Sequence, residues 1–378
     1  MTAVAGWPYP RVLHLVGDRT GCTMYRVFQP VAELQRQGAP AWAAAWTWKD
    51  TPELGDLLLR YDAVVLARLS WAGTNRADGY RWIGGLRAIG RRVWYEVDDD
   101  LFSPWITHQQ LRGGTRPDKT PEQLEGERQA RIDALGWCDG AIVTSQRLAT
   151  VVRQYTDALV VVVPNAIDWR WARAVIKQAG PREVPPVTVG WAGGARPDAD
   201  TAEMAWAWGE LARQRPDARF VVQGHQPRPV YDAVPQDRIT AIGWLPLDYY
   251  VAGLRNVDIA CCPLADKPFN RAKTPVKVFE AAAAGSAVVA SPTVYRAVLT
   301  HGEDGYLCET GEEWLGALER LVDDETERRR LAGNLRRRVA TAHSLEANAW
   351  RWPAAWTRLA QSGGPVRVPA PRLLRVAS

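Results

Sequence analysis

Short apolar runs alternate with longer helical patterns through the first half of the chain. Each run is rich in β-branched residues and ends at a polar or glycine-containing loop, which is typical of a buried strand. Strands that alternate with helices predict a mostly parallel, doubly wound sheet. The expected strands lie at residues 11–16, 62–67, 92–97, 140–144 and 158–163, and the first expected helix covers residues 25–37.

A second series of the same kind follows a Pro- and Gly-rich segment. Its expected strands are 187–191, 219–223, 239–244, 258–262 and 287–290, and its expected helices are 200–214, 276–284 and 312–322. The α/β pattern therefore predicts two Rossmann-like domains that face each other across a cleft, with the ligand at the carboxyl ends of their strands. The predicted parts are an N-terminal domain (1–179), a linker (180–186), a C-terminal domain (187–345), a crossover helix packing back on the first domain (346–361) and a disordered basic tail (362–378).

The bulk composition indicates a soluble cytoplasmic protein. A chain of 378 residues is long enough for two domains. It contains no apolar stretch of about 18 residues that would suggest a membrane-spanning helix. Residues 1–10 lack the basic and apolar regions of a secretory signal. The five cysteines are scattered without a C-x-x-C pair, which favours a reducing compartment and no metal site.

The distribution of lysine gives the first indication of a site. The net charge of +5 comes mostly from arginine, and half of the six lysines lie between Lys267 and Lys277. Thr274 is a favourable N-cap and Pro275 suits the first helical position, so a helix is expected to start there. Lysines at a helix N-terminus oppose the helix dipole unless an anion binds among them. Lys273 and Lys277 therefore predict a diphosphate-binding site.

A carboxylate lies on the same face of this predicted helix. Glu280 follows Lys277 by three residues, so the two side chains are neighbours on the helix surface. The carboxylate can accept hydrogen bonds from the vicinal hydroxyls of a ribose. The alternative is a simple surface ion pair, which contributes only about 0.2–0.5 kcal/mol.

The segment 268–290 resembles the donor-binding segment of GT-B glycosyltransferases, in particular family 4. Many members carry a Glu-x7-Glu pattern, and Glu280 matches its second Glu, which in the family binds the ribose of the nucleotide. Ala272 stands where the first Glu is expected. The usual contact with the donor sugar is therefore missing, and Asn270 or Lys273 is the candidate to replace it.

Other donor-binding residues follow from the same resemblance. The segment 189–194 is similar to the first strand and glycine loop of the donor domain, which implies that Gly193 and Gly194 approach the phosphates with Arg196 nearby. Its spacing is not G-x-G-x-x-G, which argues against a dinucleotide dehydrogenase. Three residues at strand ends, Gln223, Gly224 and Trp244, correspond to the base pocket, although Trp244 would also suit a core. The implied donor is a nucleoside diphosphate sugar, most simply a UDP-sugar, and no further cofactor is expected.

Four carboxylates lie within residues 96–100, directly after a predicted strand. Crowding raises the pKa of at least one of them, which favours a proton acceptor. Asp98 and Asp99 are therefore candidate catalytic residues in the cleft, with His108 as a candidate acceptor contact. A D-x-D magnesium site is one alternative, although GT-B enzymes generally need no metal, and a solvated loop that caps the next helix is another.

The first loop of the chain resembles the N-terminal glycine loop of the same family. Gly21, Tyr25 and Arg26 match its glycine and its Tyr-Arg pair, and Arg26 is expected to stabilise the charge of the leaving nucleoside diphosphate. Arg68, at the end of a predicted strand, is a further candidate. The resemblance implies transfer with retention of configuration.

The acceptor is less well defined by the sequence. Nineteen tryptophans and a basic loop at 111–119 would suit nucleic acid, and phage-encoded relatives of this kind glycosylate hydroxymethylated bases in DNA in the host cytoplasm. Several tryptophans nevertheless follow apolar patterns and are expected in the core: Trp206, Trp208, Trp350, Trp352 and Trp356. Glycan or lipid-linked acceptors are therefore favoured over DNA. The competing hypotheses are an inactive nucleotide-sugar or nucleic-acid binding protein and a sugar-nucleotide epimerase.

Overall fold

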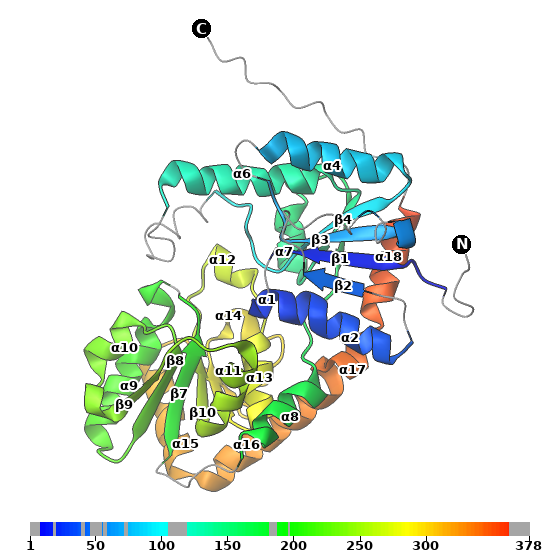
Figure 1. The fold of residues 1–378 in the computed structure, drawn as a ribbon. Coiled ribbons are helices and arrows are strands. Elements are labelled where there is room, and N and C mark those ends of the chain that lie inside the picture. Colours follow the sequence, from blue (N-terminus) through cyan, green and yellow to red (C-terminus); the bar gives the residue numbers. More distant parts are fainter. Residues whose placement is uncertain are drawn as a thin grey trace.

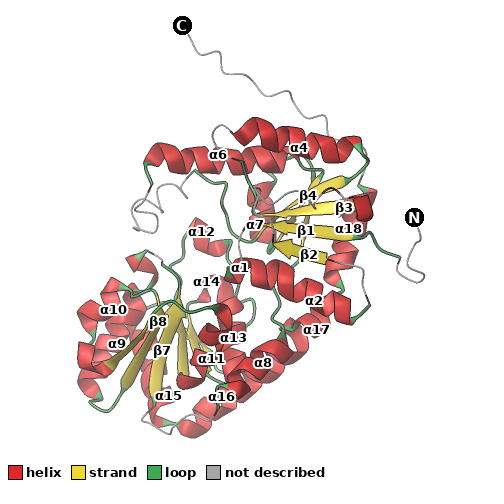
Figure 2. Ribbon diagram, in the orientation of Figure 1, coloured by secondary structure: helices red, strands yellow, loops and turns green. Residues whose placement is uncertain are grey.

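The computed structural model describes residues 8–17, 20–38, 55, 59–71, 75–104, 119–180, 187–195 and 197–362, and the backbone of 42–45. Two α/β domains lie one above the other, each with a central parallel sheet covered by helices on both faces (Figures 1 and 2). The predicted linker lies almost wholly outside the described residues, as does all of the predicted tail except Ser362.

The first domain contains a six-stranded parallel sheet. The strand order is β2 (Trp42–Ala45), β1 (Val12–Val16), β3 (Ala63–Ala67), β4 (Arg92–Val97), β5 (Gly140–Val143) and β6 (Leu159–Val162). The surrounding helices are α1 (Gly21–Thr23), a π-helical turn (Met24–Phe28), α2 (Gln29–Arg36), α4 (Arg76–Ala88), α6 (Pro121–Trp137) and α7 (Gln146–Val152). Five of these strands agree with the sequence prediction within one or two residues. Strand β2 was not predicted.

The second domain repeats this architecture. Its strand order is β12 (Tyr306–Leu307), β11 (Ala287–Ala290), β10 (Ile259–Cys262), β7 (Thr188–Gly193), β8 (Arg219–Gly224) and β9 (Ile239–Ile242). Its helices are α9 (Ala202–Gln214), α10 (Arg228–Ala233), α11 (Leu247–Gly253), α12 (Pro268–Arg271), α13 (Val276–Ala284), α14 (Pro292–Tyr295), α15 (Gly311–Asp323) and α16 (Glu325–Arg338). Helix α13 has the predicted bounds and ends at Gly285, whose φ of 87° is the left-handed conformation expected there.

The chain crosses between the domains twice, at two segments that lie side by side. Ile167 donates its backbone N–H to the carbonyl of His343 (3.0 Å) and accepts from the N–H of Leu345 (2.8 Å). Helix α8 (Trp169–Gln178) comes after the first crossing and packs on α11 and α13 of the second domain. The first crossing therefore precedes residue 168, and the predicted boundary at residue 179 is corrected.

After the second crossing, α17 (Leu345–Asn348) and α18 (Arg351–Gln361) return to the first domain (Figure 1). Helix α18 buries Trp352 and Trp356 against Val12 and Trp94 of the sheet. This packing is the predicted return of the C-terminal helix to the N-terminal domain. It also makes the first domain incomplete without α18.

The tryptophans divide between the core and the surface. Trp208, Trp352 and Trp356 are buried, as expected from their apolar patterns. Trp206 and Trp350 are 43% and 58% exposed, so their predicted core positions are wrong. Trp206 instead packs along its edge against Gly311, where a Cβ atom would lie 2.5 Å from the indole ring.

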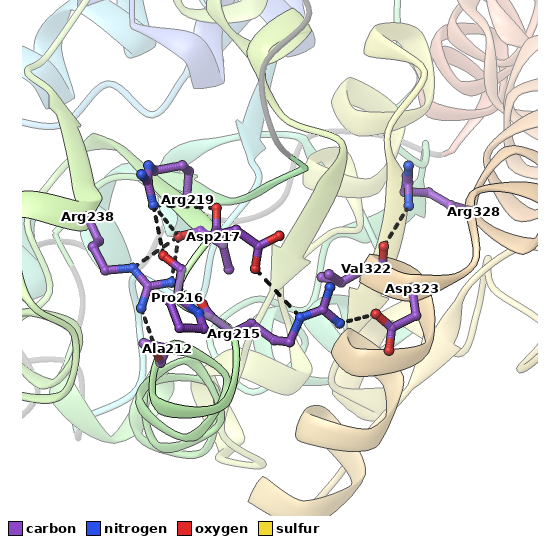
Figure 3. Close-up of polar contacts among 10 residues, drawn as sticks. Ala212, Arg215, Pro216, Asp217, Arg219, Arg238, Val322, Asp323 and Arg328 are labelled. Carbon is purple, nitrogen blue, oxygen red and sulfur yellow. Dashed lines mark hydrogen bonds and ion pairs between the residues drawn. The ribbon is translucent and has the colours of Figure 1, made fainter.

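Many arginines of the second domain bind backbone carbonyls. Arg238 donates to the carbonyls of Ala212, Arg215 and Ala218, at and beyond the C-terminal end of α9 (Figure 3). The carbonyl of Ala212 lies in the last turn of α9 and has no partner within the helix, so the guanidinium satisfies it, and it adds a donor to the carbonyls of Arg215 and Ala218. Arg328 binds the carbonyls of Leu321 and Val322 in the same way. Much of the arginine content here therefore serves folding.

Within the described part of the chain, no helix combines the length and the apolar character that crossing a membrane requires.

Candidate active site

The topological switch points of the two sheets indicate where a ligand binds. In the first sheet β1 lies between β2 and β3, and in the second sheet β7 lies between β8 and β10. Connections leave these central strands in opposite directions, which opens a crevice at their carboxyl ends. The residues that follow β1, β3, β7 and β10 therefore define the candidate site.

A cation and a carboxylate lie together on helix α13. Lys277 Nζ donates to Glu280 Oε2 (3.1 Å) and to the hydroxyl oxygen of Tyr250 (2.6 Å). The Tyr250 hydroxyl in turn donates to Glu280 Oε2 (3.1 Å). Glu280 is only 2% exposed, so this pair is more than a surface contact. Tyr250, on α11, was not singled out from the sequence, since nothing distinguishes it from its neighbour Tyr249.

Three polar contacts join this region to the first domain. The Tyr25 hydroxyl donates to Glu280 Oε1 (2.7 Å), and Asn165 Nδ2 donates to Thr274 Oγ1 (3.0 Å). Lys273 Nζ forms an ion pair with Asp99 (3.3 Å). The start of α13 therefore meets the N-terminal domain directly.

The predicted N-cap of α13 is wrong. The helix begins at Val276 after Pro275, and no side chain caps it. Thr274 instead uses its hydroxyl in the contact with Asn165. The first turn contains no acidic residue, so the positive end of the helix dipole remains available to an anion.

The four carboxylates at the end of β4 and directly after it make four different contacts. Asp98 accepts from Arg68 (3.0 Å) and Asp99 pairs with Lys273, whereas Glu96 is fully buried beside Arg26. Asp100 accepts from the backbone N–H groups of Phe102 and Ser103, which closes a turn. Asp98 and Asp99 therefore contact residues that follow β3 and β10, Arg68 and Lys273, and they remain candidates, while Asp100 has the loop-stabilising role of the alternative.

Arg26 is part of the core. Its side chain is 2% exposed, and its guanidinium donates to Glu96 (2.5 Å), to the carbonyl of Val163 (2.7 Å) and to Asn165 (2.8 Å). Burial raises the pKa of Glu96 to about 7, against the opposing effect of the Arg26 charge. This burial contradicts the predicted direct contact of Arg26 with a leaving group.

Arg68 is better placed than Arg26 to stabilise the charge of a leaving group. It follows β3 at the switch point and is the non-glycine residue with a positive φ (57°) among the described residues. Such a backbone conformation is unfavourable for an arginine and is often found at functional sites. The Asp98 charge is the main reason that the pKa of Arg68 is raised, so its guanidinium is held cationic. Cys22 lies within the electrostatic range of this pair, and burial raises the pKa of its thiol.

The position of the missing glutamate is filled by apolar packing. Ala272 is fully buried in the apolar cluster of the first domain, and its carbonyl accepts from the Ser145 hydroxyl (3.5 Å). A carboxylate here would lose its hydration without gaining a partner. Asn270, the proposed replacement, donates to Asp200 (2.7 Å) and to the carbonyl of Ala265 (2.9 Å), while its buried Oδ1 has no partner among the described residues. It thereby links the loops after β7 and β10.

The predicted glycines lie at the ends of their strands. Gly224 has a φ of 93°, and a Cβ atom there would lie 2.4 Å from the carbonyl oxygen of Gly193, so both strand ends approach closely. Gly194 lies under the ring of Trp244, which is 76% exposed and therefore available for stacking. Gln223 is 1% exposed and donates to the carbonyl of Tyr250 (2.9 Å), so its amide supports α11 in this conformation.

The remaining predicted site residues lie either at the start of α1 or outside the described residues. Gly21 is the first residue of α1, next to Cys22 at the switch point of the first domain. His108 and Arg196 lie outside the described residues. In the part of the chain that the structure covers, no three His, Cys, Asp or Glu side chains are grouped as metal ligands.

A protein-family model matches the C-terminal part of the chain. Residues 204–352 match a protein-family model described as glycosyl transferase-like. This segment includes Lys273, Lys277 and Glu280. No curated protein matches the chain.

Solved structures share the arrangement of both domains. Sucrose-phosphate synthase from Thermosynechococcus elongatus superposes with a TM-score of 0.62 at 16% identity, over 93% of this chain and 100% of that chain. Anabaena HepE in complex with UDP and glucose has a TM-score of 0.60 at 13% identity, over 92% of this chain and 100% of that chain. HepE in complex with UDP-glucose has a TM-score of 0.58 at 14% identity, over 92% and 99% of the two chains.

The protein has the GT-B fold of these glycosyltransferases, which confirms the predicted fold class. Together with the glycosyl transferase-like family match, the fold supports the assignment of the chain as a glycosyltransferase.

Proposed function

We propose that the protein transfers a sugar from a nucleoside diphosphate sugar to a hydroxyl acceptor in the cleft between the two switch points. The observation that carries this proposal is the grouping of Lys273, Lys277 and Glu280 at the start of α13, directly opposite Asp99 of the first domain. Cations, free helix amides and a carboxylate are together suited to a diphosphate and a ribose.

The donor is a UDP-sugar. Structures that share the fold contain UDP with glucose, or UDP-glucose. Lys273, Lys277 and the first amides of α13 bind the diphosphate, with the Gly193–Gly194 loop on its other side, and Arg196 is a further candidate contact. Glu280 accepts hydrogen bonds from the ribose hydroxyls. These hydroxyls replace one or both of the tyrosines, Tyr25 and Tyr250, that donate to Glu280 in this structure. Trp244 stacks on the base, next to the backbone of Gln223 and Gly224.

The charge of the leaving diphosphate is neutralised without a metal ion. Lys273 is paired with Asp99 in this structure, and a phosphate that takes the place of Asp99 makes a stronger, doubly charged partner. Arg68 adds a cation from the first domain. These fixed charges stabilise the leaving group where negative charge develops.

The acceptor hydroxyl binds on the N-terminal side, near Asp98 and Asp99, with His108 as a further candidate contact, and the sugar is transferred with retention. Acceptors of three kinds provide such a hydroxyl: a glycan, a lipid-linked compound and a hydroxymethylated base in DNA. A glycan is favoured because the described arginines of the second domain are largely engaged with carbonyls and carboxylates, which leaves less basic surface for DNA.

Nucleotide binding tests the donor site. Titration calorimetry with UDP, GDP and ADP on the wild type, Lys273→Ala and Lys277→Ala should show selective UDP binding that weakens about tenfold in each variant. Lys177→Ala, at an exposed position on α8, is the matched control and should bind like the wild type. Unchanged UDP binding in both site variants would rule out this donor site.

Turnover separates the competing functions. UDP-sugars are incubated with a glycan panel, with lipid-linked acceptors and with DNA that contains 5-hydroxymethylcytosine, and the products are analysed by mass spectrometry. A mass gain on an acceptor supports transfer and identifies the acceptor class. A changed sugar nucleotide without any acceptor indicates an epimerase, and UDP binding without turnover indicates an inactive binding protein.

A further inference from the structure

A cavity lies on the C-terminal domain beside the candidate donor site. It has a volume of about 560 Å³ and opens at the carboxyl ends of β10, β11 and β12, next to the start of α9. This volume is within the range of roughly 300–1,000 Å³ that is usual for small-ligand pockets. Neither lysine of the α13 site, nor Glu280, is among its lining residues.

Helix α12 separates the cavity from the lysine site. Asn270, on this helix, is hydrogen-bonded to Asp200 and to the carbonyl of Ala265, and both of these residues line the cavity. Lys273 follows Asn270 by three residues and points to Asp99 of the first domain. The cavity is therefore adjacent to the donor site and distinct from it.

The charges of the lining argue against a phosphate ligand. The lining includes four carboxylates, of Asp200, Glu203, Asp266 and Glu309, and two guanidinium groups, of Arg271 and Arg296. Both guanidinium groups are paired with lining carboxylates. Arg271 binds both oxygens of Asp266 (2.6 and 2.7 Å), and Arg296 contacts Glu309 (3.4 Å). A net negative lining repels an anion and attracts donor groups such as hydroxyls.

The remaining lining suits a sugar ring. Leu264, Pro263 and Trp314 provide an apolar floor in which Leu264 and Trp314 are 4% and 1% exposed. The carboxylates and arginines form a polar rim, since the Asp266 and Glu309 side chains are 62% and 68% exposed. A sugar presents an apolar C–H face and an edge of hydroxyls, which match such a floor and rim.

One buried atom on the dividing wall has no protein partner. Asn270 Oδ1 is buried and makes no hydrogen bond among the described residues, although its Nδ2 makes two. Buried polar atoms are normally satisfied, so an internal water is expected here. Asn270 is not among the lining residues, and it acts on the cavity through its hydrogen bonds to Asp200 and Ala265, which do line it.

We propose that this cavity binds a neutral saccharide and holds a sugar unit of the acceptor on the far side of α12 from the donor. The proposal rests on the proposed glycosyltransferase function, which it deepens by favouring a glycan acceptor over DNA. A bound sugar would account for the combination of apolar and charged side chains that line this cavity.

Ligand-observed NMR tests the cavity with glucose, N-acetylglucosamine, maltose and glucose 6-phosphate as probes. At least one neutral sugar should bind to the full-length protein, and glucose 6-phosphate should bind more weakly than glucose. Ala199→Trp places an indole at the exposed edge of the cavity and should weaken sugar binding about tenfold or more, with the Kd for UDP changed less than about twofold. Ala354→Trp, at an exposed position of α18, is the matched control.

A second variant guards against a folding defect in the first. Glu203→Gln keeps the size of the side chain and should weaken sugar binding about threefold to tenfold, because a charged acceptor becomes a neutral one. If UDP binds but no neutral sugar gives a signal sensitive to Ala199→Trp or Glu203→Gln, the saccharide site is overturned and the donor site stands. Tighter binding of glucose 6-phosphate than of glucose also overturns it. Absence of UDP binding overturns the proposed function instead.

Discussion

The hydroxyl of Tyr25 in the first domain donates a 2.7 Å hydrogen bond to Glu280 of the second domain. The carboxylate proposed to bind the ribose is therefore occupied by a residue of the opposite domain in this structure. Burial is the main reason that the pKa of the Tyr25 hydroxyl is raised well above its usual value, so the hydroxyl remains a donor across the accessible pH range.

Removal of this hydroxyl should lower the stability of the protein without weakening donor binding. Tyr25→Phe leaves a buried carboxylate with one donor fewer, which should lower the free energy of unfolding by about 1–3 kcal/mol. UDP should bind as tightly as to the wild type or more tightly, because the ribose no longer competes with Tyr25. Denaturant unfolding and calorimetry measure the two effects.

The matched control for this variant is Tyr249→Phe, since Tyr249 is 69% exposed and adjacent to the other tyrosine of the site. It should change neither quantity. Loss of UDP binding in Tyr25→Phe would indicate that Tyr25 itself contacts the donor.

The Asp99–Lys273 ion pair should compete with the donor phosphates. In Asp99→Asn the ammonium group loses its partner in the first domain, so UDP should bind about threefold to tenfold more tightly at low salt. Turnover need not rise, because Asp99 is also a candidate acceptor-side residue. The measurement is UDP titration at low and high ionic strength.

The gain in Asp99→Asn should shrink as salt is added, since the pair is partly exposed and screened. Asp157→Asn, on a loop remote from the cleft, serves as a control for the loss of one negative charge. An equal gain in this control would mean that only the net charge of the protein matters.

The buried Glu96 should make stability depend on pH near neutrality. Its pKa is raised to about 7 in the folded protein, above the ordinary value of 4.5, so the folded state binds the additional proton in this interval. The contribution of Glu96 to stability is therefore present below about pH 4.5 and is lost as the pH rises towards about 7. Thermal unfolding between pH 5 and 8 measures this change.

Glu96→Gln removes the titrating group, so the difference in stability between the wild type and this variant should fall as the pH rises from 5 to 7 and level off above it. His14 titrates in the opposite sense: burial lowers its pKa to about 3, and it destabilises the fold as the pH falls below 6.5. Since His14 is present in both proteins, the difference isolates Glu96. A difference that does not change with pH would contradict the raised pKa.

Arg238 should contribute to the stability of the second domain without affecting catalysis. Arg238→Ala leaves the carbonyls of Ala212, Arg215 and Ala218 without this donor (Figure 3). The expected loss is about 1–3 kcal/mol, measured by denaturant unfolding. UDP affinity of the folded protein should remain unchanged. Arg228→Ala, which removes an exposed pair with Asp232, should cost less than about 1 kcal/mol.

The sequence was a good guide to elements with a strong local pattern. Ten of the twelve strands that the structure describes were expected, because buried parallel strands are rich in β-branched residues. The two that were missed are β2, an alanine-rich run without β-branched residues, and β12, which has only two residues. Neither carries a local signal strong enough to be read as a strand.

Long-range relationships were the part that the sequence did not reveal. Lys273 and Asp99 are 174 residues apart, and Tyr25 and Glu280 are 255 residues apart, so no local spacing links them. The burial of Arg26 depends on Glu96 and Asn165, which come from two other segments. The replacement of the expected glutamate by Ala272 is explained only by the packing of this residue against the first domain.

The hydrogen bonds that Ile167 makes to the second crossing segment constrain how the domains move. Because the two segments are tied together as a pair, translation of one domain would strain both, and rotation about an axis through the pair is the permitted motion. Groups far from this axis are displaced most for a given angle. A small rotation is thus amplified where the two domains face each other, at the contacts of Tyr25 with Glu280 and of Asp99 with Lys273.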